Sequence, residues 1–476
     1  MKGHNLWSYA PYKPLLRNVG DIYVCRIVPS ENAIHFEWLD IGETEYSVFY
    51  RVRNSGEFIC CGKTKGTEFN IVNLETNTDF EFYVCSCEKN SLIRLARTGK
   101  TVGTVVNYLH PDDEAYSFSG RYLCSPSLVR HPDGFLLASM DLFAPNHPQN
   151  LTLIFRSDDD GKSWYYVSEL MPCFWGKMFI HRDELYMLAC STEYGDLVIG
   201  KSTDGGRTFS EPICLLRGSN GKDRTEGVHK NPQNLLIHNS RIYSTLEWGS
   251  YKNLEYGHAA MVMSSSVDSD LLKPESWTFT EPKIFENFVP EIATLPKGTV
   301  PIEGTLVLSA DGRLLNIMRL CSYFLPMTIA DSESDIAKFV LKGCAIAYEV
   351  DMENHGAPLS FSHVISLATF SKFMIKYDNV SKKYYSLVSR VHNKTKCRAR
   401  NVLSLFSSND LKEFSLVTDI LDYSDGDSSK IGFQYVDFEI EGDDIIFLSR
   451  TALNNANNYH DANYSTFHRI KNFRNI

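Results

Sequence analysis

Two eight-residue segments of the 476-residue sequence match each other, and their spacing constrains the fold more than any other feature. Residues 157–164 read SDDDGKSW and residues 202–209 read STDGGRTF, so both fit the pattern S-x-D-x-G-x-[ST]-[WF]. In such a segment the Asp and the Gly make a tight turn between two strands, and the aromatic side chain fills the space between neighbouring sheets. The copies begin 45 residues apart, which is the length of one four-stranded unit in a repeat protein. We therefore expect a chain of repeated sheets in which these turns are structural.

Short alternating strands occupy almost the whole chain. Segments such as 33–40, 45–53, 80–87 and 151–157 alternate apolar and polar residues and are closed by Gly, Asn, Asp or Pro. No helical period continues over four turns. The 12% aromatic content suits sheets, because flat rings pack well on a pleated surface. The sequence therefore predicts an all-β protein.

Charge and apolar patterning argue against two classes of partner. The net charge is −10 and no Lys/Arg run forms a basic patch, so nucleic-acid binding is not expected. No apolar stretch has the length of a membrane span, and the first residues contain no apolar leader core. The 12 cysteines include no C-x-x-C pair, which favours free thiols in a reducing cytoplasm. A leader that had been removed would instead indicate secretion.

The first 105 residues resemble a fibronectin-type-III-like β-sandwich. Trp38 lies within an early strand, where such modules place a core tryptophan, and residues 74–84 resemble their corner motif L-x-P-x-T-x-Y. Phe80 stands at the tyrosine place and Thr76 at the proline place, so the corner hydrogen bond is expected to be missing. We expect residues 98–117 to connect this module, residues 1–105, to the remainder of the chain.

Residues 106–476 contain six strand–turn–strand units. They cover residues 125–141, 176–193, 229–247, 303–319, 371–390 and 434–450. The matching segments at 157–164 and 202–209 are identified as Asp-boxes, and together with the six hairpins they make residues 106–476 similar to the sialidase superfamily. That resemblance implies a six-bladed β-propeller whose Asp-boxes lie away from the catalytic face.

Polar side chains mark both ends of these hairpins. In a propeller the loops that enter the first strand and leave the second lie nearest the axis, so these ends should ring one pocket. They are, in chain order, Ser125, Asp141, Lys177, Glu193, His229, Lys230, Glu247, Glu303, Arg319, Lys372, Arg390, Gln434, Tyr435 and Arg450. Because polar ends recur at equivalent places in all six units, the pattern predicts a binding site.

The sialidase resemblance implies roles for four of these residues. Glu303 and Tyr435 match a nucleophilic carboxylate–phenol pair, and Asp141 is the candidate acid/base. The carboxylate accepts the phenol proton, the phenolate attacks the anomeric carbon, and the separate acid protonates the leaving oxygen. Arg319, sixteen residues after Glu303, matches an arginine that holds the carboxylate of the sugar. We therefore expect an exo-acting, retaining glycoside hydrolase.

The sequence departs from the sialidase pattern at two of its three arginines. Cys124 stands where the first arginine belongs, and the third falls on or near Lys372, with Arg450 or Arg390 as compensating residues. The expected anion-binding set is therefore Arg319, Lys372 and Arg450. Because lysine lacks the rigid fork of arginine, a uronic acid is as plausible a terminal sugar as sialic acid.

Two histidines without a counterpart in that family keep other functions open. His229, which precedes Lys230, and His460 could each remove the proton α to a uronate carboxylate, which is polysaccharide lyase chemistry. A non-catalytic glycan-binding propeller is the third alternative.

In each case the partner is a glycan, and the sequence leaves the oligomeric state open. The substrate-binding candidates beyond the three basic residues are His229, Lys230, Glu247, Gln434, His460 and Trp175. The histidine spacing has no metal signature, so neither a metal nor a cofactor is expected.

Overall fold

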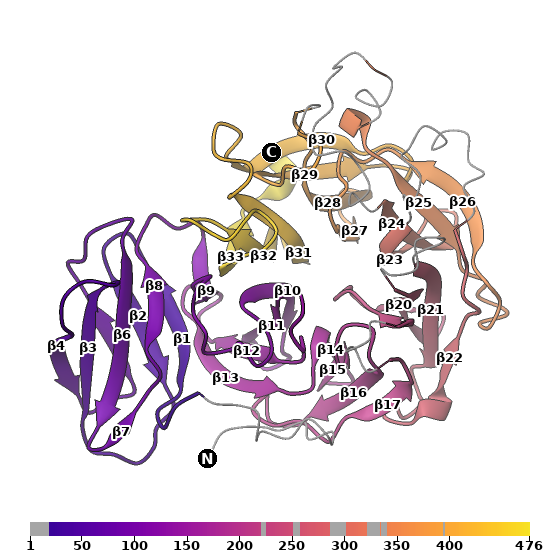
Figure 1. Cartoon of the computed structure of the whole chain (residues 1–476). Coiled ribbons are helices and arrows are strands. Elements are labelled where there is room, and N and C mark those ends of the chain that lie inside the picture. The colour runs from indigo at the N-terminus through magenta and orange to yellow at the C-terminus, as the bar shows by residue number, and fades with distance from the viewer. Residues whose placement is uncertain are drawn as a thin grey trace.

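The chain folds into a series of antiparallel sheets, seen in a computed structural model (Figure 1). The structure describes residues 19–219, 225–250, 258–285, 301–320, 334, 340–393 and 396–476. Nearly all regular structure in these residues is β, apart from short 3-10 helices such as Pro274–Ser276 and Phe473–Asn475. The predicted all-β class is therefore confirmed.

Two sheets pack face to face at the N-terminal end. One has the order β1-β2-β5, formed by β1 (Val24–Pro29), β2 (Ile34–Trp38) and β5 (Glu68–Ile71). The other has the order β4-β3-β6-β7 with β8 on β6, formed by β3 (Tyr46–Val52), β4 (Ile59–Thr64), β6 (Asp79–Ser86), β7 (Lys89–Asn90) and β8 (Arg94–Arg97). Alternate residues of both sheets point inward, so that the Phe36 ring of one packs against the Phe82 ring of the other, 4.3 Å between ring centroids. Trp38 is buried in this core beside Tyr46.

Within the described residues, six further sheets follow one another along the chain and surround a common centre (Figure 1). The first two are β10 (Tyr122–Arg130), β11 (Leu136–Phe143), β12 (Thr152–Ser157) and β13 (Tyr165–Leu170), then β14 (Phe174–His181), β15 (Glu184–Cys190), β16 (Leu197–Ser202) and β17 (Ile213–Leu216). The third is β18 (Gly227–His229), β19 (Leu236–His238), β20 (Arg241–Gly249), β21 (His258–Ser266) and β22 (Trp277–Phe279). The fourth is β23 (Pro301–Leu308), β24 (Leu314–Leu320), β25 (Ala345–Glu349) and β26 (Ser360–Ile365). The fifth is β27 (Ile375–Asp378), β28 (Lys383–Ser389), β29 (Val402–Ser408) and β30 (Ser415–Asp422).

The sixth sheet joins the two ends of the ring. It consists of β31 (Gly432–Glu441), β32 (Asp444–Ala452) and β33 (Tyr464–Ile470), and its outermost strand is β9 (Thr104–Tyr108) from the beginning of the ring. Tyr464 pairs with Tyr108 in this ladder. The connection predicted for residues 98–117 thus supplies a strand to the last sheet. The expected division after residue 105 falls inside β9, and four-stranded sheets arranged in this way are consistent with a β-propeller.

The two matching segments form the same turn. In the first, Ser163 donates from its backbone N and its Oγ to the Asp159 carboxylate at 2.8 and 2.6 Å, and Thr208 bonds Asp204 at the same two distances in the second. The Trp164 ring is buried against Phe467 of the sixth sheet, 5.5 Å between ring centroids. The aromatic residue therefore packs between sheets, as the pattern predicts.

The N-terminal sandwich is clamped to the ring through β9 and the segment that follows it. Arg26 of β1 donates from Nε to the Val106 carbonyl at 2.7 Å and from Nη2 to the Val105 carbonyl at 3.3 Å. These bonds cover carbonyls at the outer edge of the sheet, which would otherwise be an open strand edge.

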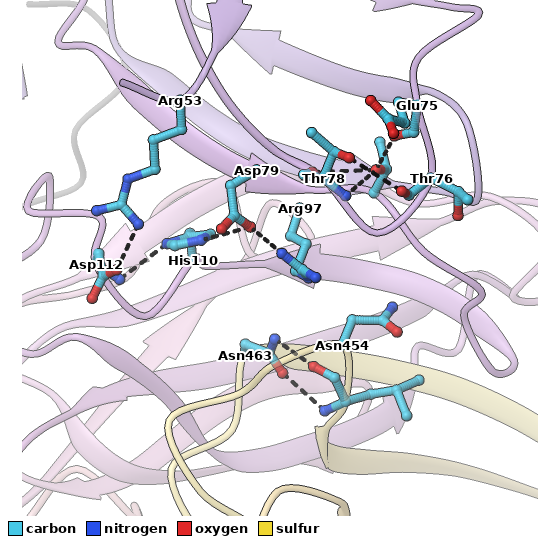
Figure 2. A network of polar contacts seen from close by, with 12 residues as sticks. Arg53, Glu75, Thr76, Thr78, Asp79, Arg97, His110, Asp112, Asn454 and Asn463 are labelled. Carbon is cyan, nitrogen blue, oxygen red and sulfur yellow. Dashed lines mark hydrogen bonds and ion pairs between the residues drawn. The ribbon is translucent and has the colours of Figure 1, made fainter. Parts of the chain in front are cut away.

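Among the described residues, three polar contacts between side chains hold residues 110–113 against the sandwich. Figure 2 shows two of them: His110 Nε2 lies 3.4 Å from Asp79 Oδ1, and Arg53 Nη1 lies 2.7 Å from Asp112 Oδ2. The third is a buried ion pair in which Arg94 Nε lies 2.8 Å from Asp113 Oδ2. The sandwich and the ring are therefore in fixed contact.

No helix in the described ranges is long and apolar enough to cross a membrane. Eleven cysteines lie in those ranges and all are free thiols. A cytoplasmic location stays a prediction.

Candidate functional site

A recurrent β-bulge shapes the centre of the ring. The first strand of four sheets shifts register against the second at Cys124/Ser127, Phe174/Lys177, Ile302/Gly304 and Gln434/Asp437. Each bulge contains one non-glycine residue with positive φ, namely Ser125 (33°), Trp175 (52°), Glu303 (59°) and Tyr435 (54°). Such conformations cost energy and concentrate at functional sites. Glu303, Tyr435 and Trp175 are predicted catalytic or substrate-binding residues, and Ser125 is one of the hairpin ends predicted to line the pocket.

At the bulges, backbone N–H groups donate hydrogen bonds to buried carboxylates. Trp175 N donates to Asp141 Oδ2 at 2.8 Å, and Gly304 N donates to Glu247 Oε1 at 3.1 Å. Asp141 and Glu247 are fully buried on the second strands of their sheets. The same irregularity thus fixes two of the acidic side chains expected at the site.

Glu303, Arg319 and Tyr435 lie together, as the sequence predicts. Arg319 Nε donates to Glu303 Oε2 at 2.5 Å, and Arg319 Nη2 lies 3.4 Å from the Tyr435 hydroxyl. Burial alone would raise the pKa of Glu303, but the Arg319 guanidinium outweighs it, so that pKa lies below its ordinary value. Burial and the Glu303 charge both raise the pKa of Tyr435, which is therefore a neutral phenol in the resting protein.

Two further arginines flank the ring of Tyr435. The guanidinium carbon of Arg450 lies 5.0 Å from the ring centroid and that of Arg400 lies 5.7 Å from it. Arg450 Nη1 also donates to the Cys124 Sγ at 3.0 Å. Cys124 stands at the position where the sequence pattern expects the first arginine, so the Arg450 guanidinium lies close to that position. The structure therefore brings Arg319, Arg400 and Arg450 around one phenol.

Arg400 is the functional candidate that sequence reasoning missed. It precedes β29 and belongs to no hairpin end, so its position in the sequence gives no signal. Arg390, weighed as a compensating residue, is instead directed to Asp419, which it contacts through Nε and Nη2 at 3.0 and 2.7 Å.

Lys372 lies outside this arginine cluster. Its Nζ is buried and donates to the carbonyls of Pro232 and Val436, each at 3.3 Å. The structure places the Lys372 amine on two backbone carbonyls, and its contact with a sugar stays a prediction. Its charge still acts on Glu303, whose pKa it helps to lower.

Lys230 and Lys177 are buried in the same way. Lys230 Nζ contacts the Asn231 carbonyl at 3.2 Å, and Lys177 Nζ pairs with Asp437 Oδ2 at 2.5 Å. Burial lowers the pKa of Lys230 and that of Lys372 to about 8. These amines contribute positive charge to the centre of the ring. Lys230 is fully buried, and its contact with a substrate stays a prediction.

Asp141 has the environment of a carboxylic acid. Thr152 Oγ1 donates to its Oδ1 at 2.6 Å, and Trp175 N donates to Oδ2. Complete burial outweighs these bonds and raises the pKa of Asp141 to about 7. An acid with this pKa can both donate and accept a proton near neutrality.

The second group of predicted residues forms an aromatic cluster next to Asp141. His229 Nδ1 lies 2.6 Å from Glu247 Oε2, and the Trp175 ring lies 4.2 Å from the His229 ring. Tyr194 and His258 extend the cluster through a hydrogen bond of 3.1 Å between the Tyr194 hydroxyl and His258 Nε2. Burial is the main reason that the pKa of His258 lies well below its usual value, and the nearby His229 and Arg319 lower it further.

Gln434 organises the opposite wall. Its Oε1 accepts a hydrogen bond from Arg400 Nη1, and its Nε2 donates to the carbonyls of Tyr459 and His460 at 2.6 and 3.1 Å. The predicted substrate-binding residue Gln434 thus orients Arg400 and the loop that carries His460.

The comparisons with known proteins show the fold. No family model and no curated protein matches this sequence. Among solved structures, an α-L-arabinanase from Penicillium chrysogenum complexed with arabinobiose is 14% identical with a TM-score of 0.51, covering 79% of this chain and 99% of its own. An α-L-arabinofuranosidase from Fusarium graminearum in complex with an iminosugar inhibitor is 12% identical with a TM-score of 0.50, covering 77% of this chain and 97% of its own. A protein of unknown function from Dyadobacter fermentans has the same TM-score of 0.50 at 10% identity, covering 78% of this chain and 98% of its own. The likeness to these three structures shows that this chain shares their fold.

Proposed function

We propose that this protein is an exo-acting glycoside hydrolase that removes a terminal acidic sugar, of the sialic acid or uronic acid type, from a glycan. The observation that carries the proposal is the convergence of Arg319, Arg400 and Arg450 on Tyr435, beside Glu303. Two enzymes that share the fold are named for action on arabinose glycans, which supports a carbohydrate substrate. Acidic specificity rests on the arginines of this chain alone.

The charge at the centre of the ring favours an anion. The guanidiniums of Arg319, Arg400 and Arg450 surround the phenol of Tyr435. Arg319 also contacts the Glu303 carboxylate directly. Arginine binds carboxylates through two parallel hydrogen bonds, and such bonds are strongest in buried surroundings. We therefore expect Arg400 and Arg450, which flank the Tyr435 ring, to bind the sugar carboxylate next to the reacting phenol.

The residues present can carry a two-step retaining reaction. In the first step the Tyr435 oxygen attacks the anomeric carbon and its proton passes to Glu303, while Asp141 donates a proton to the leaving oxygen as the glycosidic bond breaks. In the second step Asp141 takes a proton from water, the water oxygen attacks the same carbon, and Tyr435 leaves and recovers its proton from Glu303. Arg319, 3.4 Å from the Tyr435 hydroxyl, stabilises the negative charge on the phenolate.

The pH dependence should report Asp141. Because the acid must be protonated to donate and its pKa is about 7, kcat/KM of the wild type should fall as the pH rises above about 7. Asp141→Asn keeps the size of the side chain and removes the acid, so turnover of a natural glycan should drop by roughly 10²–10⁴-fold. For a nitrophenyl glycoside, whose leaving group needs no proton, kcat/KM should fall much less, because it reports the first step alone. An unchanged alkaline limb in Asp141→Asn would exclude Asp141 as the acid.

Arg400 should determine affinity for the acidic group. Arg400→Gln removes the charge, and KM for the acidic glycoside should rise by about 10–100-fold, the range expected for a lost hydrogen bond to a charged group. Arg390→Gln is the matched control, because Arg390 faces Asp419 and should leave KM unchanged. Equal KM values in both variants would remove Arg400 from the binding site.

A polysaccharide lyase is the second candidate, favoured by the His229–Glu247 pair. Glu247 orients His229 at 2.6 Å, which is how a carboxylate prepares an imidazole as a base. Tyr194, close to His258, is a phenol in the same cluster that could serve as the acid. An unsaturated product that absorbs ultraviolet light would establish this reaction in place of hydrolysis, and glycan binding without turnover would indicate the non-catalytic alternative.

The proposal extends to the architecture. We assign the six sheets from β10 to β33, completed by β9, as six propeller blades with the two matching turns as Asp-boxes. The N-terminal sheets, ordered β1-β2-β5 and β4-β3-β6, are assigned as a fibronectin-type-III-like sandwich, supported by buried Trp38 and Phe80.

A glycan screen tests the function directly. The purified chain is incubated with sialosides, uronate-capped oligosaccharides and neutral controls, and released sugar is measured by mass and unsaturated product by absorbance. Release of an acidic monosaccharide is the expected result. Release of neutral sugars alone would reject the assignment of an acidic substrate.

A further inference from the structure

The loop between β32 and β33 fixes His460 by contacts that do not involve Nε2 of its imidazole. Asn457 Nδ2 and Asn458 Nδ2 donate to Asp461 Oδ2 at 2.7 and 2.8 Å, and Asn458 Oδ1 accepts the backbone N–H groups of His460 and Asp461 at 2.7 and 2.9 Å. Arg450 Nη2 donates to the His460 carbonyl at 2.6 Å. The loop is therefore fixed through its backbone and through Asp461.

The contacts of the ring define its tautomer. His460 Nδ1 lies 2.9 Å from Asp461 Oδ1, and Arg450 Nη2 lies 3.3 Å from the same nitrogen. A nitrogen that carries a proton can donate to Asp461 but cannot accept from Arg450, and the shorter contact with the carboxylate is the stronger one. Arg450 Nη2 already has the carbonyl as an acceptor. The arrangement therefore favours a proton on Nδ1 and a lone pair on Nε2.

Nε2 is available at the site. In the part of the chain that the structure describes, no hydrogen bond reaches this atom, and the side chain is 34% exposed. The ring lies 6.5 Å from the Tyr435 ring and 5.5 Å from that of Phe143, two residues beyond Asp141. His460 thus lies beside the ring of the catalytic candidate Tyr435.

We infer that His460 is a specificity-determining residue whose Nε2 accepts a hydrogen bond from a hydroxyl of the bound acidic sugar, and that Asp461 is the residue that positions it. This inference rests on the proposed function for its substrate class. Burial and the Arg450 charge lower the pKa of His460 to about 4, so the imidazole is neutral at working pH. A neutral acceptor suits an anionic sugar, because a carboxylate in its place would repel the ligand.

Substrates and variants test the inference together. His460→Phe keeps a ring against Phe143 and removes the acceptor, so KM for the acidic glycoside should rise by about 10-fold, as for one lost hydrogen bond, with little change in kcat. The wild type should discriminate against a deoxy analogue that lacks the recognised hydroxyl, and His460→Phe should lose that discrimination. Asp461→Asn should reproduce both effects. His238→Phe, on the hairpin of β19 and β20, is the control. Unchanged KM and unchanged discrimination in His460→Phe overturn the inference.

A spectroscopic measurement separates this inference from the proposed function. Long-range ¹H–¹⁵N correlation spectra, assigned with His460→Phe, should show His460 protonated at Nδ1, and free sialic or glucuronic acid should shift its Nε2 signal. A proton on Nε2 overturns the inference whatever the enzyme hydrolyses. If no acidic glycoside is turned over, the proposed function fails; a shifted Nε2 signal would then still support the role of His460, and an unshifted one would overturn it.

Discussion

Replacing Tyr435 with Phe is expected to lower kcat for an acidic glycoside by about 10³-fold or more, because the variant has no oxygen to attack the anomeric carbon. The ring remains between Arg400 and Arg450, so affinity for the acidic sugar should be retained. Single-turnover kinetics and calorimetric binding to a catalytically inert acidic sugar measure the two quantities separately.

Tyr459 provides the matched control. Its ring also faces Arg400, with the guanidinium carbon 5.6 Å from the ring centroid, yet it has no role in the proposed reaction. Tyr459→Phe should keep kcat within a small factor. If Tyr435→Phe turned over glycans as fast as Tyr459→Phe, the phenol could not be the nucleophile.

Asp113→Ala is expected to destabilise the protein by about 3–5 kcal/mol, the range for breaking a buried ion pair from one side. The change leaves the Arg94 guanidinium buried without its carboxylate, and it also removes the acceptor of the Leu95 and Ala115 backbone N–H groups. Urea denaturation followed by tryptophan fluorescence measures the loss in the free energy of unfolding.

The neighbouring ion pair is the control for that experiment. Asp112 binds Arg53 at 2.7 Å, but Asp112 is about half exposed, so Asp112→Ala should cost no more than about 1 kcal/mol. Both aspartates bind the same segment to the sandwich (Figure 2 shows Asp112). The difference between the two variants in the free energy of unfolding therefore measures the effect of burying the ion pair. Equal losses would mean that the segment, and not the buried charge, determines stability.

The strand pattern of this protein could be predicted because it is local. Each of the six predicted hairpins coincides with the first two strands of one sheet, apart from the third, where β18 and β19 share the place of one strand. Alternation and turn residues are properties of neighbouring positions, so they survive in a single sequence. The pairing of Glu303 with Arg319 follows from the same hairpin geometry.

The part of the site that could not be predicted depends on bulges and on distant segments. The positive φ of Glu303 and Tyr435 gives no signal, since neither is a glycine or an asparagine, and the bulge decides which side chain faces the centre. Lys372 consequently contacts backbone carbonyls, one of them that of Val436, while Arg400, from the loop before β29, lies beside Tyr435. No local pattern records that contact, because 35 positions separate the two residues.

The pairing of β9 with β33 has a consequence for synthesis on the ribosome. Val105 and Val106 emerge early, but their partner strand is made only when the last sheet is translated, which takes roughly 20–70 s at about 5–20 residues per second. During that interval the sandwich, complete by Arg97, can already fold, and Arg26 can hold the two carbonyls of β9. The folded sandwich then prevents the unpaired strand β9 from pairing with other chains until β33 has been made.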